Sequence, residues 1–246
     1  MMNAKAWLTV LLIMTAILLN TACTSTSSTE PDSSAEQLSL LAEIPEDEIF
    51  LYARESDGVL LKIGEHERTF DWEYMTPRMV MPEMQTYDVD ADGENELVIL
   101  LYIGSGTGVS INELRIIEFD ESGHIVDHVF KSEDYRAQVG HNTEFRTLLR
   151  EEALLGEITI GSNRYSVNLS EYQSDEYGKI ADHLLYGNIV NFNNENQQMT
   201  VDFAIGIGIE TFVEPVYIGT LVADVSFRDG EFRLSNFRYI PEEQYL

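Results

Sequence analysis

The residues best suited to chemistry in this 246-residue chain are five acids in the stretch DVDADGENE, residues 88–96. They are Asp88, Asp90, Asp92, Glu94 and Glu96, and they occupy alternate positions. Carboxylates held this close repel one another, and a bound cation relieves the repulsion. Ca²⁺ takes about six to eight oxygen ligands, which a short loop supplies when alternate side chains converge. Gly93 stands at the sixth position, where the loop must bend sharply. The sequence therefore predicts a Ca²⁺ site with these five ligands.

The residues that follow the acids separate this loop from an EF-hand. Its twelfth position is Ile99 instead of a glutamate, and the apolar run LVILLYI predicts a strand instead of a helix. The stretch resembles the D-x-D-x-D-G-x-x-[DE] loops of FG-GAP and VCBS-type repeats in integrin-like and bacterial surface proteins. The resemblance covers about residues 86–103, with Glu96 where Asp is common. It implies a calcium loop that leads into a strand, and the alternative is a solvated acidic turn.

The N-terminus carries a second signature. Lys5 precedes the apolar stretch 6–19, which has the length of a signal-peptide core. Cys23, the only cysteine, follows in LNTAC, which resembles the lipobox of bacterial lipoproteins, although Asn20 stands where that family prefers Leu, Val or Ile. The resemblance implies a signal peptide over 1–22, acylation of Cys23 (as with palmitate), and attachment to the extracytoplasmic face of the bacterial cell membrane. The alternatives are an ordinary secretory peptide and an uncleaved anchor.

The charge of the chain limits its partners. The formal net charge of −28 opposes nucleic acid, which proteins bind through Lys and Arg contacts to phosphate. It equally opposes docking on anionic lipid headgroups, so we expect membrane attachment through the lipid alone. With one cysteine there is neither a disulfide framework nor a thiolate metal site.

Other candidate sites are weaker. The loop GSGTGVS, residues 104–110, lacks the ending of a phosphate-binding P-loop and is expected to be a hairpin loop. His124 and His128 are expected on a strand, where their spacing is too wide to share a zinc ion. Thioethers suit copper(I), but the methionine cluster is interpreted as apolar filler with copper as the alternative. This cluster comprises Met75, Met79, Met81 and Met84.

The elements that position these residues are predicted to be mostly strands. We expect a mainly β (α+β) fold, in which hairpins join antiparallel sheets and one or two short helices are added. Strands are expected at 48–53, 59–64, 97–103, 113–119 and 124–130, with a hairpin over 157–169 and further strands towards the C-terminus. Helices are expected at 143–155, with Gly156 as the stop, and less strongly at 175–187.

The predicted organisation has three parts: the signal peptide 1–22, a lipidated Cys23 with a Ser/Thr-rich tether to residue 44, and one extracytoplasmic domain over 45–246. A short helical turn is expected near 36–43.

The predicted function class follows from the predicted localisation and the acidic loop. Neither a G-x-S-x-G nor an S-x-x-K motif is present, so we expect no enzyme. The prediction is a lipoprotein with a calcium-stabilised binding or sensing domain and an envelope or protein partner. The alternative is a secreted hydrolase of envelope polymers with a structural calcium, which would need a deep cleft.

Overall fold

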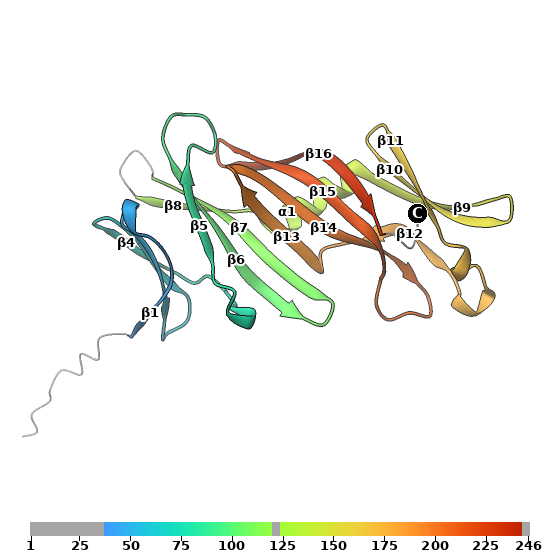
Figure 1. Cartoon of the computed structure of the whole chain (residues 1–246), viewed down its shortest axis with the longest axis horizontal. Helices are drawn as coiled ribbons and strands as arrows, with labels where there is room; N and C mark the ends of the chain where they lie inside the picture. Colours follow the sequence, from blue (N-terminus) through green and yellow to red (C-terminus); the bar gives the residue numbers. More distant parts are fainter. Residues whose placement is uncertain (1–36, 120–123, 243–246) are drawn as a thin grey trace, which may run out of the picture. The chain divides into compact units, whose positions relative to one another are not determined.

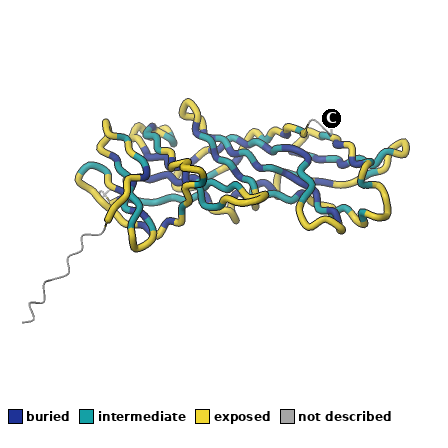
Figure 2. The backbone as a smooth tube through the Cα atoms, turned by 60° about the horizontal axis from the view of Figure 1, so that its bottom comes forward, coloured by how far each residue is buried: buried dark blue, intermediate teal, exposed yellow. Residues whose placement is uncertain are grey.

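The computed structural model of the chain describes residues 37–119 and 124–242, which are mainly β as the sequence predicts (Figure 1). The predicted signal peptide and Cys23 lie outside the described residues. The described residues belong to one compact unit, Glu36–Leu246. Buried positions follow the middle of the strands, whereas the hairpin turns are exposed (Figure 2).

The first sheet has four antiparallel strands in the order β1-β2-β3-β4. These are β1 (Leu38–Ile44), β2 (Ile49–Arg54), β3 (Val59–Ile63) and β4 (His66–Phe70). The 3₁₀ turn η1 (Pro45–Asp47) joins β1 to β2, and η2 (Pro77–Met79) follows β4.

The largest sheet has nine strands, seven of them in the order β16-β15-β14-β13-β7-β6-β5. Strand β8 pairs with β7, and β12 pairs with β14. The strands are β5 (Glu83–Tyr87), β6 (Glu96–Gly106), β7 (Val109–Phe119), β8 (Ile125–Val129), β12 (Ile180–Leu185), β13 (Ile189–Glu195), β14 (Gln198–Ile209), β15 (Val216–Arg228) and β16 (Glu231–Pro241). All pairs are antiparallel except β13 with β7.

The third sheet, the helix α1 and two further 3₁₀ turns lie between β8 and β12 in the chain. The sheet has the order β11-β10-β9 and consists of β9 (Thr143–Arg150), β10 (Ala153–Ile160) and β11 (Asn163–Asn168). Helix α1 (Ser132–Asn142) precedes it, and the 3₁₀ turns η3 (Ser170–Tyr172) and η4 (Asp175–Tyr177) follow. Gln138 of α1 donates to the carbonyl of Phe232 (3.1 Å) and accepts from the N–H of Leu234 (2.7 Å), which satisfies backbone groups of β16.

Two hydrophobic cores meet at strand β6. Leu97, Ile99 and Leu101 pack in one core with residues of the first sheet. Val98 and Leu100 point the other way and pack in a larger core with residues of β13 to β16. Side chains alternate between the two faces of a strand, so an apolar run such as LVILL is expected where both faces are covered.

The predicted boundary at residue 45 and the helical turn near 36–43 are wrong. Residues 38–44 form β1, which pairs with β2 from Leu38 opposite Arg54 to Ile44 opposite Ile49. The buried side chain of Leu41 packs in the same core as Leu51. Ala42 and Ile44 also pack against this core, so the folded chain extends into the predicted tether.

The predicted helix at 143–155 is also wrong, because these residues form the hairpin β9–β10. Glu151 and Glu152 both have left-handed backbone angles (φ 50° and 71°), and this tight turn reverses the chain. Gly156 is no helix stop: a Cβ on it would lie 2.8 Å from a ring carbon of Phe145. Such a turn is usually recognised in a sequence by glycine or asparagine, and here both turn residues are glutamates.

The segment 175–187 contains η4 and strand β12 instead of a helix. Ile180 lies opposite Ile209 and Leu184 opposite Ile207, so β12 is held by its pairing with β14. The one α-helix among residues 37–119 and 124–242, α1, was not predicted. It buries only Tyr135 and Val139, one turn apart, and so lacks the apolar periodicity from which a helix is read.

Candidate metal centre

The acidic stretch forms the loop between β5 and β6 (Figure 1). Gly93 has a positive φ angle (97°), so the backbone turns where the sequence predicts a bend, and Ala91 also has a positive φ angle (67°). Strand β6 begins at Glu96. The predicted arrangement of an acidic loop that leads directly into a buried strand is therefore present.

Hydrogen bonds within the loop hold three of its carboxylates. Asp88 accepts from the N–H groups of Asp92 and Gly93, both at 3.1 Å. Asp90 also accepts from the Asp92 N–H (3.1 Å), and Asp92 accepts from the Glu94 N–H (2.8 Å). These bonds wrap the backbone around the side chains of Asp88 and Asp90, since each spans only a few residues.

Three of the five predicted ligands converge. One carboxylate oxygen from each of Asp88, Asp90 and Glu96 lies within 4.8 Å of the other two. Asp92 and Glu94 are exposed and do not join this group. Glu96 closes the group from the strand side: its carboxylate accepts from the N–H of Val89 at 2.7 Å, and the residue is only 4% exposed.

The electrostatics of Glu96 favour a cation. Burial raises the pKa of Glu96, the Val89 N–H lowers it, and the charges of Asp90 and Asp92 raise it further. The ionised carboxylate is therefore destabilised by its surroundings, which a bound cation would reverse. All donors are oxygens, as hard cations such as Ca²⁺ require, and three carboxylates leave further positions for backbone oxygen or water. The donor set fits calcium.

The loop also contacts the turn between β15 and β16. The guanidinium of Arg228 donates to the backbone carbonyl of Asp90 at 3.3 Å. A hollow of about 560 Å³ lies between Val89–Ala91 on one side and Ser226–Asp229 on the other. The acidic loop thus contacts β15 and the turn after it, which lie more than a hundred residues later in the chain.

The weaker candidates take ordinary structural places. GSGTGVS spans the β6–β7 hairpin, in which Gly106 lies opposite Val109, as expected. His128 lies on β8, with Nε2 2.5 Å from a carboxylate oxygen of Glu118, and its ring packs edge-on against Phe227. Met84 packs against a core, whereas Met79 is 86% exposed, so these two methionines have different surroundings.

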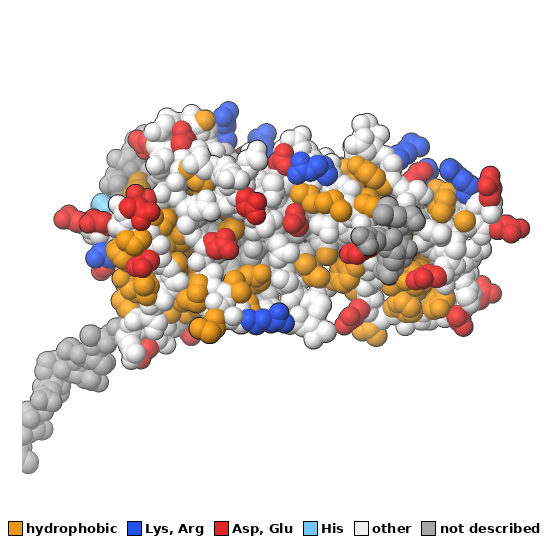
Figure 3. All heavy atoms as spheres, in the orientation of Figure 1, with side chains coloured by type: hydrophobic (Ala, Val, Ile, Leu, Met, Phe, Trp, Pro, Cys, Tyr) orange, Lys and Arg blue, Asp and Glu red, His pale blue; other side chains and the backbone are white. Residues whose placement is uncertain are grey.

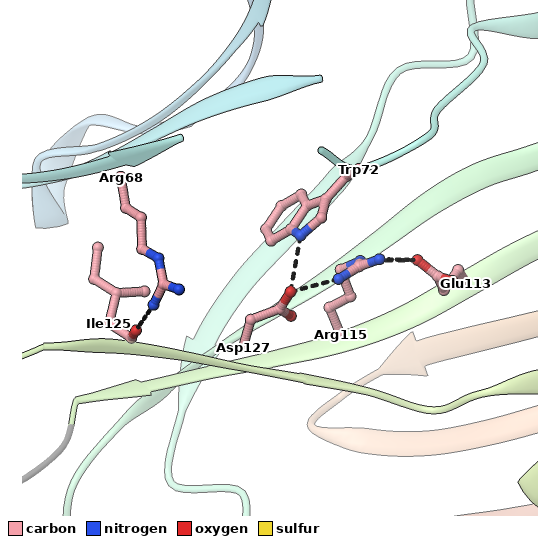
Figure 4. Close-up of polar contacts among 6 residues, drawn as sticks. All are labelled: Arg68, Trp72, Glu113, Arg115, Ile125 and Asp127. Carbon is pink, nitrogen blue, oxygen red and sulfur yellow. Dashed lines mark hydrogen bonds and ion pairs between the residues drawn. The ribbon is translucent and has the colours of Figure 1, made fainter. Parts of the chain in front are cut away.

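A buried charged network was not predicted (Figure 4). Arg115 on β7 contacts Glu113 at 2.7 Å and Asp127 on β8 at 2.5 Å, and its guanidinium lies 4.5 Å from the ring centre of Trp72. The Trp72 indole N–H also donates to Asp127 (2.8 Å). Arg68 of β4 donates to the carbonyl of Ile125. The network thus links the segment after β4 to β7 and β8.

A signal for this network exists in the sequence. Arg115 and Asp127 interrupt the apolar strands ELRIIEF and HIVDHVF, and a charge within a buried strand needs a partner. Burial raises the pKa of Glu113, and Arg115 acts in the opposite direction. The pairing itself joins three separate segments and cannot be read from spacing.

Comparison of the chain with protein-family models, with curated proteins and with solved structures finds no match. Within residues 37–119 and 124–242, none of the helices combines the length and the apolar character needed to cross a membrane.

Proposed function

We propose that this chain is a membrane-anchored, extracytoplasmic bacterial lipoprotein whose β-rich domain binds one structural Ca²⁺ and serves in binding or sensing. The convergence of Asp88, Asp90 and Glu96 at the start of β6 carries the proposal. Asp92 and Glu94 complete the proposed ligand set through their side chains, a carbonyl or water. Acylated Cys23 supplies the membrane attachment.

The ion would act by fixing the β5–β6 loop. It offsets the repulsion among the three converging carboxylates and anchors the buried Glu96. Extracellular calcium modules have dissociation constants of about 10⁻⁴–10⁻³ M. With calcium tenfold above the dissociation constant, binding adds about 1.4 kcal/mol to the free energy of unfolding. For a chain of this length, that corresponds to a rise in melting temperature of about 3–6 °C.

A calcium titration of the purified full-length chain tests the metal site. Thermal unfolding is measured in EDTA and in rising calcium, for the wild type and for Asp88→Asn/Asp90→Asn. A matched control, Asp71→Asn/Asp182→Asn, removes the same charge from exposed positions elsewhere. We expect the wild type and the control to gain stability with calcium and the loop variant to gain none. An equal gain in all three proteins would refute the site.

Membrane fractionation tests the anchor independently. We expect the wild type to partition with bacterial membranes and to incorporate labelled palmitate, and Cys23→Ser to lose the label and enter the soluble fraction. Label on the Cys23→Ser protein would contradict the assignment.

A further inference from the structure

A second cavity, of about 480 Å³, opens where strands β7 and β13 separate. These strands pair only through Ile189 with Ser110 and Val190 with Ile111. Beyond that point the Asn112 side chain replaces the ladder: its Nδ2 donates to the Phe192 carbonyl (3.0 Å) and its Oδ1 accepts from the Phe192 N–H (2.6 Å). The two strands therefore separate here although the backbone N–H and C=O groups of Phe192 keep hydrogen-bond partners.

The lining of this cavity supplies hydrogen bonds and negative charge. The side chains of Asn191 and Asn193 from β13 and of Asp202 from β14 line it, with Glu83 and Glu195 also contributing. Among the described residues that line it there is no Lys, Arg or His. Acidic side chains are also spread over the face of the molecule drawn in Figure 3. An anionic ligand is therefore disfavoured at this cavity.

The amide and acid groups are held in place before any ligand arrives. Asn191 lies opposite Asp202 in the β13–β14 ladder, so their side chains share one face. Asn193 Nδ2 donates to Asp202 Oδ2 at 3.3 Å, and the Ser110 hydroxyl lies 3.5 Å from Asn191 Oδ1. An amide offers both donors and acceptors, and a hydroxyl group on a ligand needs both. A cationic ligand would use only the acceptors.

One rim of the cavity is apolar. Val80 and Met81 line the cavity and are 43% and 40% exposed. They follow Arg78 and Met79, two residues with positive φ angles (52° and 65°), each of which costs about 1–3 kcal/mol. Pro82 comes directly after them. Met81, one of the four clustered methionines, therefore forms with Val80 an exposed apolar edge beside a polar cavity.

We propose that this cavity binds a neutral saccharide, whose hydroxyl groups bond to Asn191, Asn193 and Asp202 while the C–H face of the ring packs on Val80 and Met81. The volume lies in the range of about 300–1,000 Å³ typical of small-ligand sites. The site is separate from the acidic loop and needs no ion there, so it goes beyond the proposed calcium function.

The test is a glycan array carrying neutral and anionic glycans, probed with the labelled full-length chain, followed by calorimetry with the neutral saccharide that binds best. We expect saturable binding to neutral glycans. Asn191→Ala should weaken it about tenfold, since a hydrogen-bonding group of the cavity is lost. The matched control Asn163→Ala, at the exposed first position of β11, should bind like the wild type.

Two further arms keep the outcome decisive. Met81→Ala changes a partly exposed rim residue, and it should weaken binding while the melting temperature stays near that of the wild type. Saccharide binding is measured again in EDTA, where it should persist. This arm distinguishes failure of the saccharide site from failure of the calcium site, which is measured by the melting temperature. Signal on anionic glycans alone, no signal on neutral ones, or full binding by Asn191→Ala would each overturn the proposal.

Discussion

Replacing Arg115 with methionine should destabilise the chain more than any other single change in the charged network. The residue is 9% exposed and contacts Glu113, Asp127 and the face of Trp72. Methionine keeps much of the packing volume but leaves the partly buried carboxylates of Glu113 and Asp127 without their cation. Removing one partner of a buried ion pair costs about 3–5 kcal/mol, so we expect a loss of that size in the free energy of unfolding.

The matched control removes the charges together. In Arg115→Met/Glu113→Gln/Asp127→Asn no buried carboxylate of this group is left unpaired, and we expect stability within about 2 kcal/mol of the wild type. Urea unfolding, followed by Trp72 fluorescence and circular dichroism, measures both variants. The sequence has two tryptophans, the other being Trp7 of the predicted signal peptide.

The pH dependence gives a second readout of the same variant. Burial already raises the pKa of Glu113, and loss of Arg115 removes the group that lowers it. The folded variant therefore holds a proton that the unfolded chain releases, and its free energy of unfolding falls as the pH rises through that raised pKa. The deficit against the wild type should be smallest in acid. A single variant that loses less than about 1 kcal/mol, or a triple variant no better than the single, would refute the reasoning.

Four other substitutions test separate parts of the structure. Glu96→Gln should raise the melting temperature in EDTA and abolish the rise in melting temperature with calcium. In EDTA the wild type should lose stability as the pH rises through the raised pKa of Glu96, because the folded chain binds more protons there than the unfolded chain. Burial raises the pKa of Tyr87 to about 12 and also raises those of Tyr135 and Tyr186, so the phenolate absorbance should show a late-titrating component that Tyr87→Phe reduces. Leu101→Ala, at a fully buried position, should cost about 2–5 kcal/mol in urea unfolding. Gly156→Ala should cost about 1–3 kcal/mol, because its methyl group would collide with the Phe145 ring. A calcium shift retained by Glu96→Gln, an unchanged titration curve for Tyr87→Phe, or losses near zero for the other two would contradict the respective arguments.

The strands were predictable where local signals agree. LVILLYI and ELRIIEF carry long apolar runs, and they form β6 and β7 with a hairpin between them. The hairpin β9–β10 was missed because Phe145, Leu148 and Leu149 also fit a helical face and two glutamates form the turn. In such a segment, pairing between β9, β10 and β11 decides the structure, and the apolar spacing alone does not distinguish it from a helix.

The candidate sites divide in the same way. The acidic loop is local in sequence, so its alternation predicts the convergence of Asp88, Asp90 and Glu96. The spacing could not show that Asp92 and Glu94 stay exposed, because that depends on how the loop bends. The cavity beside Asn191 joins segments far apart in the chain, and so does the bond from Trp72 to Asp127 in the network at Arg115. Only the folded arrangement reveals them.

Strand β6 has a consequence for how the domain opens. Its side chains alternate between the two cores. Opening either core exposes one apolar face of β6, and loss of β6 from the sheet disrupts both cores. Native-state hydrogen exchange should therefore report one slow unit that includes the centres of β3, β6 and β14, with a common opening free energy. Thermal denaturation should follow a single transition, because a strand that belongs to both cores makes them one cooperative unit.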